Sequence, residues 1–132
     1  MTTFAMVLQS SMQHEIIPDV REFVGEDESG SFGLLGKHER FMTVLTFGLA
    51  RFSSGPDGQW RFLALPEALV YFSRNILQVT TRRYFLDDSY DRISDRLNQE
   101  LRAEEEAIAD IKSGLRRIEQ ELLQRVLDVT RR

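Results

Sequence analysis

Few side chains in this sequence have the types and the spacing that chemistry requires. The chain has no cysteine, and its two histidines, His14 and His38, lie 24 residues apart. These counts exclude disulfides and thiol catalysis and disfavour a histidine-based zinc site. His38 stands beside Lys37, Glu39 and Arg40 and has the chemistry of a general base, but no nucleophile accompanies it. We therefore prefer a structural or interface role for His38.

The acidic run Glu104-Glu105-Glu106 has the composition of a metal site but not its geometry. Consecutive residues of a helix point in different directions, so a solvated helix face is the better interpretation. The sequence also lacks a Walker-type phosphate loop, a Gly-x-Ser-x-Gly elbow and a His-Glu-x-x-His motif. A net charge of −4 argues against a general nucleic-acid binder. We expect a protein that is not an enzyme and that uses no cofactor or metal.

The length of 132 residues suits one domain with a core, or a small domain with an appendage. The N-terminal residues 1–6 lack the charged and long apolar regions of a secretory signal. The most apolar window, residues 62–72, is too short to span a bilayer and contains Pro66 and Glu67. We expect a soluble, cytoplasmic protein that would need a partner to bring it to a membrane.

The first part of the chain, residues 1–86, has the pattern of a β-sandwich or barrel. Its short aromatic-rich runs alternate with period two, as half-buried strands do. The alternating residues are Phe4, Met6 and Leu8, then Phe47 and Leu49, Leu63 and Leu65, and Leu77 and Val79. Residues 53–58 (Ser-Ser-Gly-Pro-Asp-Gly) predict a hairpin loop, and Arg74-Asn75 predicts a tight turn.

The most distinctive stretch runs from Gly25 to His38 and holds four glycines in fourteen residues. Its acidic tip, residues 26–28, predicts a solvated turn that leads into a half-buried strand carrying Phe-Gly-Leu-Leu. The next run, residues 41–52, keeps the composition of an apolar strand.

From Asp87 the composition becomes helical. Asp87, Asp88 and Ser89 supply a helix cap and negative charge at the helix start. Apolar residues then recur every seventh position, as in a coiled coil or a helical hairpin. They are Leu101, Ile108, Leu115, Leu122 and Val129, with Leu97, Ile111 and Ile118 at the second heptad position, which Glu104 and Arg125 interrupt.

Charge divides this helical segment, residues 87–132, into two halves. Residues 87–110 hold nine acidic and three basic side chains, and residues 111–132 hold three acidic and six basic ones. Folding back near Gly114 would pair the acidic half with the basic half. The heptad phase nevertheless runs through Gly114, and one glycine costs a helix only about 1 kcal/mol. The sequence therefore supports either a hairpin or one long helix, with exchange between the two as a hypothesis.

Four motifs in this order carry a family resemblance. They are Gly30 to His38, the Phe-Gly-Leu around Gly48, residues 60–65 (Trp-Arg-Phe-Leu-Ala-Leu), and the strand-turn-strand of residues 68–79. Together with the helical segment, they make the whole chain resemble the epsilon subunit of F-type ATP synthases. The resemblance implies an α+β protein at the cytoplasmic face of the plasma membrane. Its sandwich would bind the gamma subunit on one side and the polar loops of the c-ring on the other. Its C-terminal helices would open along gamma and restrain ATP hydrolysis.

On this resemblance we assign two groups of site residues. The proposed interface with the c-ring and gamma contains Ser29, Gly30, Ser31, Phe32, Lys37 and His38. The proposed inhibitory arm presents Arg116, Arg117 and Arg125 to an acidic surface on the alpha/beta catalytic head. The boundary between the rotor-binding domain and the regulatory domain is placed between residues 86 and 87.

The chain also departs from the family pattern. Gly36-Lys37, Glu39-Arg40 and Pro66-Glu67 stand where the family has Pro-Gly, Ala-Pro and Gly-Gly. The ATP-binding motif of some members falls on residues 90–95, where Asp91 remains but Ser94 replaces the arginine. We expect weak or no ATP binding, and a divergent branch such as the alternative ATP synthases of some bacteria. The competing hypothesis is a β-sandwich adaptor with a coiled-coil arm, unrelated to rotary ATPases.

Overall fold

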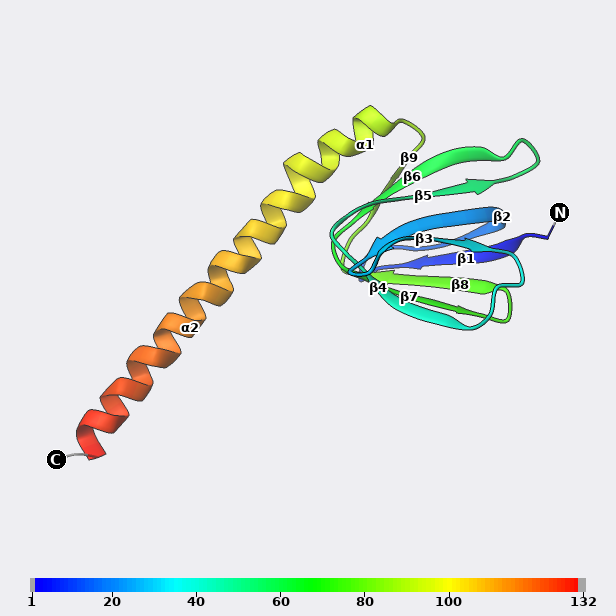
Figure 1. The fold of residues 1–132 in the computed structure, drawn as a ribbon. Helices are drawn as coiled ribbons and strands as arrows, with labels where there is room; N and C mark the ends of the chain where they lie inside the picture. Colours follow the sequence, from blue (N-terminus) through cyan, green and yellow to red (C-terminus); the bar gives the residue numbers. More distant parts are fainter. Residues whose placement is uncertain (1, 131–132) are drawn as a thin grey trace. The chain divides into compact units, whose positions relative to one another are not determined.

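The computed structural model describes residues 2–130, and the chain divides into two compact units, residues 1–101 and the residues from Arg102 on. The first unit holds the strands and a short helix, and the second consists of helix α2 (Figure 1). The predicted α+β fold, a β-sandwich followed by a helical segment, is confirmed. The functional boundary between residues 86 and 87 stays a prediction.

The strands of the first unit form one hydrogen-bonded path. The path runs β4-β7-β8-β1-β2-β5-β6-β9, with β3 paired to β2. All neighbours are antiparallel except β1 and β8, which are parallel. The bounds are β1 Phe4–Gln9, β2 His14–Asp27, β3 Gly30–Leu35, β4 Phe41–Leu45, β5 Gly48–Ser54, β6 Gln59–Leu65, β7 Ala68–Ser73, β8 Ile76–Thr81 and β9 Phe85–Asp87.

Strand β2 is long enough to serve two parts of this path. Its first half pairs with β1, and its second half pairs with β3 and β5. The register shifts near Val20, next to Asp19, whose φ of 55° is left-handed. A bulge of this kind bends a strand and increases its twist. The bend lets the path fold over on itself.

The fold-over creates one core. Alternate residues of β1 to β8 meet in a single buried cluster, which includes Met6, Phe23, Phe52, Leu63 and Leu77. The predicted alternation is confirmed for β1 and β8, because Phe4, Met6, Leu8, Leu77 and Val79 are buried and the residues between them are not. In β6, Leu63 and Leu65 face this core, but Ala64 between them is also buried, in a separate cluster. Phe47 and Leu49 are only half-buried, and they pack on a second cluster outside this core.

The predicted turns are also found. The acidic tip is a turn at Glu28-Ser29 between β2 and β3, and residues 55–58 join β5 to β6. Arg74 and Asn75 both have left-handed φ, 52° and 63°, as a two-residue hairpin turn requires.

The prediction of one strand over residues 41–52 is wrong. The segment breaks at residues 46–47 into β4 and β5, which lie at different places in the strand order. The Thr46 backbone N–H donates to the Glu26 carbonyl oxygen (3.0 Å), so the chain is tied to β2 where it crosses over. Composition could not reveal the break, because both pieces are apolar.

The first helical segment packs on the outer side of β6. Helix α1 covers Tyr90–Arg96 and continues into η1, a π-helical turn at Leu97–Leu101. Ile93, Leu97 and Leu101 are buried and form the second cluster with Ala64 and Phe85. Half-buried Phe47, Leu49 and Phe62 complete the apolar surface against which the helix packs.

The second unit is the single helix α2, Arg102–Thr130, coloured yellow to red in Figure 1. It passes through Gly114 without interruption, so the structure has the long helix of the two predicted alternatives. Among the described residues of this unit, which end at Thr130, α2 is the only element, so none of them covers its apolar side chains.

Candidate functional site

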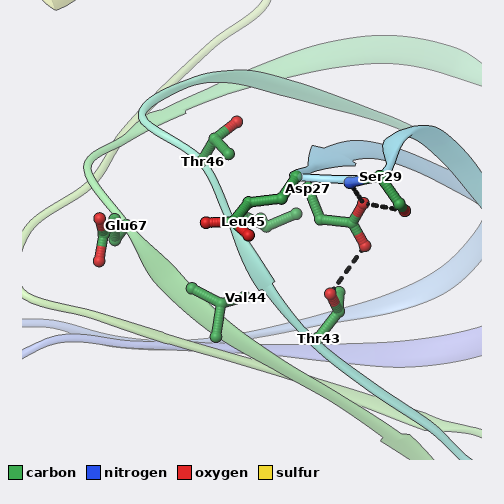
Figure 2. Close-up of a pocket in the computed structure, with 8 residues that line it drawn as sticks. Asp27, Ser29, Thr43, Val44, Leu45, Thr46 and Glu67 are labelled. Atoms are coloured by element: carbon green, nitrogen blue, oxygen red, sulfur yellow. Dashed lines mark hydrogen bonds between the residues drawn. The ribbon is translucent and has the colours of Figure 1, made fainter.

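The tip of the β2–β3 hairpin is a well-ordered acidic turn (Figure 2). The Asp27 carboxylate accepts hydrogen bonds from the Ser29 backbone N–H (2.9 Å), the Ser29 hydroxyl (2.5 Å) and the Thr43 hydroxyl of β4 (2.7 Å). The Ser29 hydroxyl, and then that of Thr43, lower the pKa of Asp27 below its ordinary value. Gly30 follows with φ 120°, which favours glycine. Glu28 and Ser29 are left exposed on a fixed turn.

A hollow of about 540 Å³ lies beside this tip. Its lining comes from the β2–β3 turn, from β4 and from the β6–β7 turn (Figure 2). Asp27, Glu28 and Glu67 give it three carboxylates, and Val44 and Leu45 give it an apolar floor. Such a surface suits a basic side chain presented by a loop.

Lys37 and His38 lie at the other end of β3. The Lys37 backbone N–H donates to the Asn75 side-chain oxygen (2.8 Å) in the β7–β8 turn. The His38 ring makes edge contacts with Phe41 and Phe72 and lies 2.7 Å, Nδ1 to oxygen, from the Glu39 carbonyl. Strand β3 separates this end from Ser29 by about 20 Å, at roughly 3.3 Å per residue. The structure therefore does not bring the six predicted interface residues into one patch.

The predicted interface residues around Gly30 have unequal exposure. Ser29 and Ser31 are exposed, whereas the Phe32 ring is half-buried and packs on Phe23 and Phe41, with centroids 6.4 and 5.2 Å apart. Phe32 therefore supports the hairpin from the core side. The side chains of Ser29 and Ser31 are open to solvent.

Sequence reasoning missed an apolar face on the outside of β4, β7, β8, β1 and β2. The register places Met42, Tyr71, Gln78, Val7 and Ile16 in one row across these strands. Met42 and Ile16 are 65% and 63% exposed, and Val44, Leu69 and Ile76 on the same face are exposed as well. The available signal was Ala-Leu-Val-Tyr-Phe in β7, where both alternating sets are apolar. We call Ile16, Met42, Val44, Leu69, Tyr71 and Ile76 the outer apolar face.

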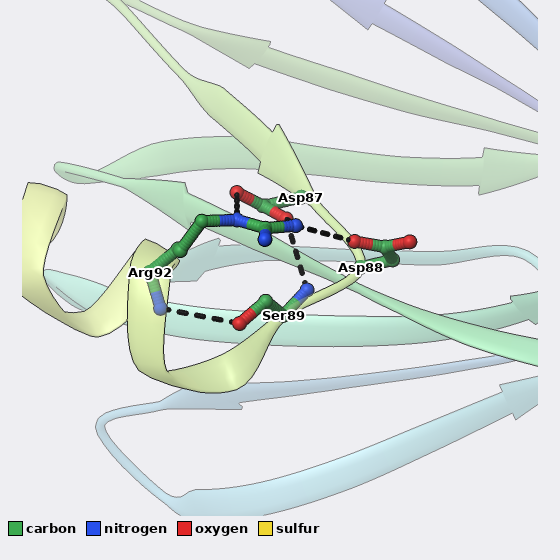
Figure 3. A network of polar contacts seen from close by, with 4 residues as sticks. All are labelled: Asp87, Asp88, Ser89 and Arg92. Atoms are coloured by element: carbon green, nitrogen blue, oxygen red, sulfur yellow. Dashed lines mark hydrogen bonds and ion pairs between the residues drawn. The ribbon is translucent and has the colours of Figure 1, made fainter.

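The start of α1 is a closed polar network (Figure 3). The Ser89 hydroxyl accepts from the Arg92 backbone N–H (3.4 Å), which confirms the predicted cap, and Asp87 accepts from the Ser89 backbone N–H (2.9 Å). The Arg92 guanidinium donates to Asp87 (2.9 and 3.1 Å) and to Asp88 (2.9 Å). The hydrogen bonds from Arg92 are the largest cause, and the bond from the Ser89 N–H the second, of a pKa of Asp87 that lies well below its ordinary value.

This network determines which side chains at the start of α1 could contact the phosphates of ATP. Residues 90–95 correspond to the ATP motif of the resembled family, and Arg92 is their arginine. Its guanidinium is already bonded to two carboxylates, those of Asp87 and Asp88. Ser94 is half-buried and has no cationic group to offer a phosphate.

The arm residues Arg116, Arg117 and Arg125 are all exposed on α2. At 100° per residue they point in different directions, and of the three only Arg125 lies within the apolar stripe, at the second heptad position. Among residues 2–130, no group of three histidine, aspartate or glutamate side chains is placed to hold a metal ion. No helix of this described range is long and apolar enough to cross a membrane.

Part of the sequence is similar to an ATP synthase epsilon chain. A 58-residue match, 38% identical, links the chain to "ATP synthase epsilon chain 2" of Cereibacter sphaeroides. The resemblance to ATP synthase epsilon chains is confirmed. The match covers 44% of this chain and 37% of that epsilon chain, so well under two thirds of the relative's length is spanned. No protein-family model matches the chain.

Solved structures share the epsilon-like fold. A chain in the mitochondrial ATP synthase of Euglena gracilis (OSCP, F1 and c-ring) matches with a TM-score of 0.57 at 13% identity, over 65% of this chain and 54% of that one. A chain in the central stalk and c-ring of the Tetrahymena thermophila mitochondrial ATP synthase matches with a TM-score of 0.52 at 12% identity, over 64% and 69%. At these identities the likeness concerns the fold alone.

Proposed function

We propose that the chain is a non-catalytic, epsilon-type subunit of the central stalk of a rotary ATP synthase, at the cytoplasmic face of the plasma membrane. The observation that carries the proposal is the 38% identical match to an epsilon chain. The fold agrees, because similar chains occur in solved ATP synthase complexes. In this function the subunit joins the gamma subunit to the c-ring and holds no cofactor.

The outer apolar face is proposed as the contact with gamma. Stable protein interfaces have an apolar centre with a polar rim, and here Met42, Leu69 and Ile76 lie around Tyr71, with Arg40 over the tyrosine ring at 5.8 Å. A hollow of about 450 Å³ adjoins the face, so a side chain of a partner could enter it. It is lined by Arg40, Tyr71, Ser73, Arg74, Ile76 and Gln78. Lys37 and His38 border this face through the β7–β8 turn.

Co-purification with gamma tests the assignment. Tagged chain expressed with gamma should retain it, and Met42→Asp should reduce the retained gamma at least tenfold because a carboxylate would be buried in an apolar contact. Gln59→Asp, an equal change at an exposed position of β6, is the control and should bind normally. Failure of the unaltered chain to retain gamma would favour the unrelated adaptor instead.

The hairpin tip is proposed to meet the polar loops of the c-ring. Ser29 and Ser31 are exposed there, and the acidic hollow beside Ser29 suits a basic loop residue. Glu28→Lys should reduce coupled ion transport in the assembled enzyme without unfolding the sandwich. Asp57→Lys, in the exposed β5–β6 loop, is the matched charge reversal. Equal transport by both variants would remove the tip from the c-ring contact.

Helix α2 is proposed as an arm that restrains ATP hydrolysis by placing Arg116, Arg117 and Arg125 against the alpha/beta head. Ending the chain after Asp110 should leave assembly intact and raise hydrolysis relative to synthesis. Gly114→Ala should deepen the inhibition, because it stiffens the helix and a methyl group there meets nothing within 4 Å. Unchanged hydrolysis by the truncated form would make the arm a brace rather than an inhibitor.

Regulatory ATP binding is not part of the proposed function. Calorimetric titration of the isolated chain should give no micromolar ATP site, because Arg92 is bonded to Asp87 and Asp88 and Ser94 supplies no charge. A micromolar site would show that another group of cations holds the phosphates.

A further inference from the structure

Helix α2 carries a coiled-coil seam that its own unit leaves uncovered. The seam has alternating spacings of three and four residues, as two-stranded coiled coils do. Its members are Ile108, Ile111, Leu115, Ile118, Leu122 and Val129. Ile111, Leu115, Ile118 and Leu122 are 53–63% exposed. A row of exposed apolar side chains with this spacing marks a surface that a second helix can cover.

The polar interruptions of the seam indicate the direction of that partner. Glu104 and Arg125 both occupy the second heptad position, one near each end of α2. In a parallel pair of identical helices, each would face its own copy, which places like charges together. In an antiparallel pair, Glu104 of one helix approaches Arg125 of the other. Residues 102–110 carry four acidic and one basic side chain, and residues 111–130 carry four basic and three acidic ones, so the antiparallel direction also keeps the acidic starts of the two helices apart.

We propose that unassembled copies of this chain form a homodimer through an antiparallel coiled coil of their α2 helices. Antiparallel coils stack the first heptad position of one helix on the second position of the other. The central layers then pair Leu115 with Ile118 and Ile111 with Leu122 of the second copy. In the same register Glu104 and Arg125 of the second copy fall in adjacent layers, about one helical turn apart. Lys112 and Glu119 face each other beside the seam.

The dimer would have a consequence for any use of α2 as an arm. It covers the seam and brings Arg125 near Glu104 of the second copy, so an α2 helix in the dimer is withheld from other partners. This inference rests on the seam and the charges alone. It stands or falls separately from the assignment to the ATP synthase.

Sedimentation velocity of the full chain tests association. The purified protein should sediment as a dimer at micromolar concentration, and Leu115→Glu should weaken the dimer by about tenfold or more, because a buried leucine is lost from each copy. Gln120→Glu adds the same charge on the opposite side of α2 and should leave the dimer intact. A monomer at every concentration, or a dimer that Leu115→Glu does not affect, would overturn the proposal.

Cross-linking tests the direction, since the natural chain has no cysteine. A mixture of Ile111→Cys and Leu122→Cys chains should form a mixed disulfide. Each variant alone should not cross-link, because the cysteines of its two identical copies lie 11 residues apart in the antiparallel register. That offset is about 16 Å along the helix, beyond the reach of a disulfide. Self-linking of each variant without mixed linking would show a parallel pair and contradict the antiparallel proposal.

Discussion

The two helical regions of this chain carry one apolar pattern but have different environments. In α1 and η1, the side chains of Ile93, Leu97 and Leu101 are buried on the outer side of β6. In α2 the same heptad continues, but its unit contains no other element to cover it. An amphipathic pattern therefore establishes that a helix needs a partner without saying whether the partner is in the same chain.

What distinguishes the two regions is the surface available to each. Phe47, Leu49, Phe62 and Ala64 give the outer side of β5 and β6 an apolar surface of the size of three helical turns, and α1 with η1 covers it. Beyond the surface covered by α1 and η1, the first unit exposes six further apolar residues together on the outer apolar face of β2, β4, β7 and β8. The outer apolar face and α2 are the two apolar surfaces on which we base partner proposals.

The largest effect is expected from removing a buried side chain of α1, the helix that packs on β6. Ile93→Ala removes a fully buried side chain and should lower the free energy of unfolding by about 2–4 kcal/mol. Leu123→Ala, at an exposed position of α2 outside the heptad stripe, should change the same transition by less than about 0.5 kcal/mol because it removes no buried contact. Urea denaturation followed by Trp60 fluorescence measures both. Equal destabilisation would mean that α2 is as much a part of the core as α1.

An intermediate effect is expected at the cap that begins the covered helix. Ser89→Ala removes the hydroxyl that accepts from the Arg92 N–H and should cost about 1 kcal/mol. Ser113→Ala, an exposed change within α2, is the control and should be neutral or slightly stabilising. If Ser89→Ala is neutral in urea denaturation, the bonds of Asp87 and Arg92 suffice to fix the helix start.

The smallest effect is a pH dependence from Asp87. Its pKa in the folded chain is lower than its ordinary value of 3.8, because Arg92 bonds the ionised form. A depressed pKa stabilises the fold above about pH 4, and that stability is lost as the pH falls through the folded value. Asp87→Asn should therefore lower the melting temperature at pH 7, and the difference from the natural chain should shrink as the pH falls below 4.

The measurement of this pH dependence needs a charge-matched control. Asp57→Asn removes a carboxylate from the exposed β5–β6 loop, and thermal melts of both variants separate a local effect from net charge. A difference for Asp87→Asn that persists undiminished to pH 2 would assign the loss to geometry instead of ionisation.

Local features of the fold were predictable where turn chemistry and alternation agree. The acidic tip, the Arg74-Asn75 turn and the Ser89 cap each follow from residues that favour one backbone conformation. The break between β4 and β5 was not predictable, because it depends on a hydrogen bond between Thr46 and Glu26, 20 residues apart. Long-range pairing of this kind leaves no mark in local composition.

The candidate site was predictable only in part, for a related reason. Sequence proximity grouped Ser29 with Lys37 and His38, but a strand of six residues places them at opposite ends of β3. The outer apolar face is made by residues from four strands, β2, β4, β7 and β8, whose register the sequence does not state. Met42 and Ile16 share one face of the sheet only because that register aligns them in the same row.

The most direct test of the account is the affinity of gamma for two forms of the chain. We expect the full chain and the chain that ends at Asp110 to bind gamma with dissociation constants that agree within about twofold, since the outer apolar face belongs to the first unit. Titration by calorimetry measures both in one series, with Met42→Asp as the variant that should lose binding. Absence of gamma binding by either form would contradict the central claim that this is an epsilon-type rotor subunit.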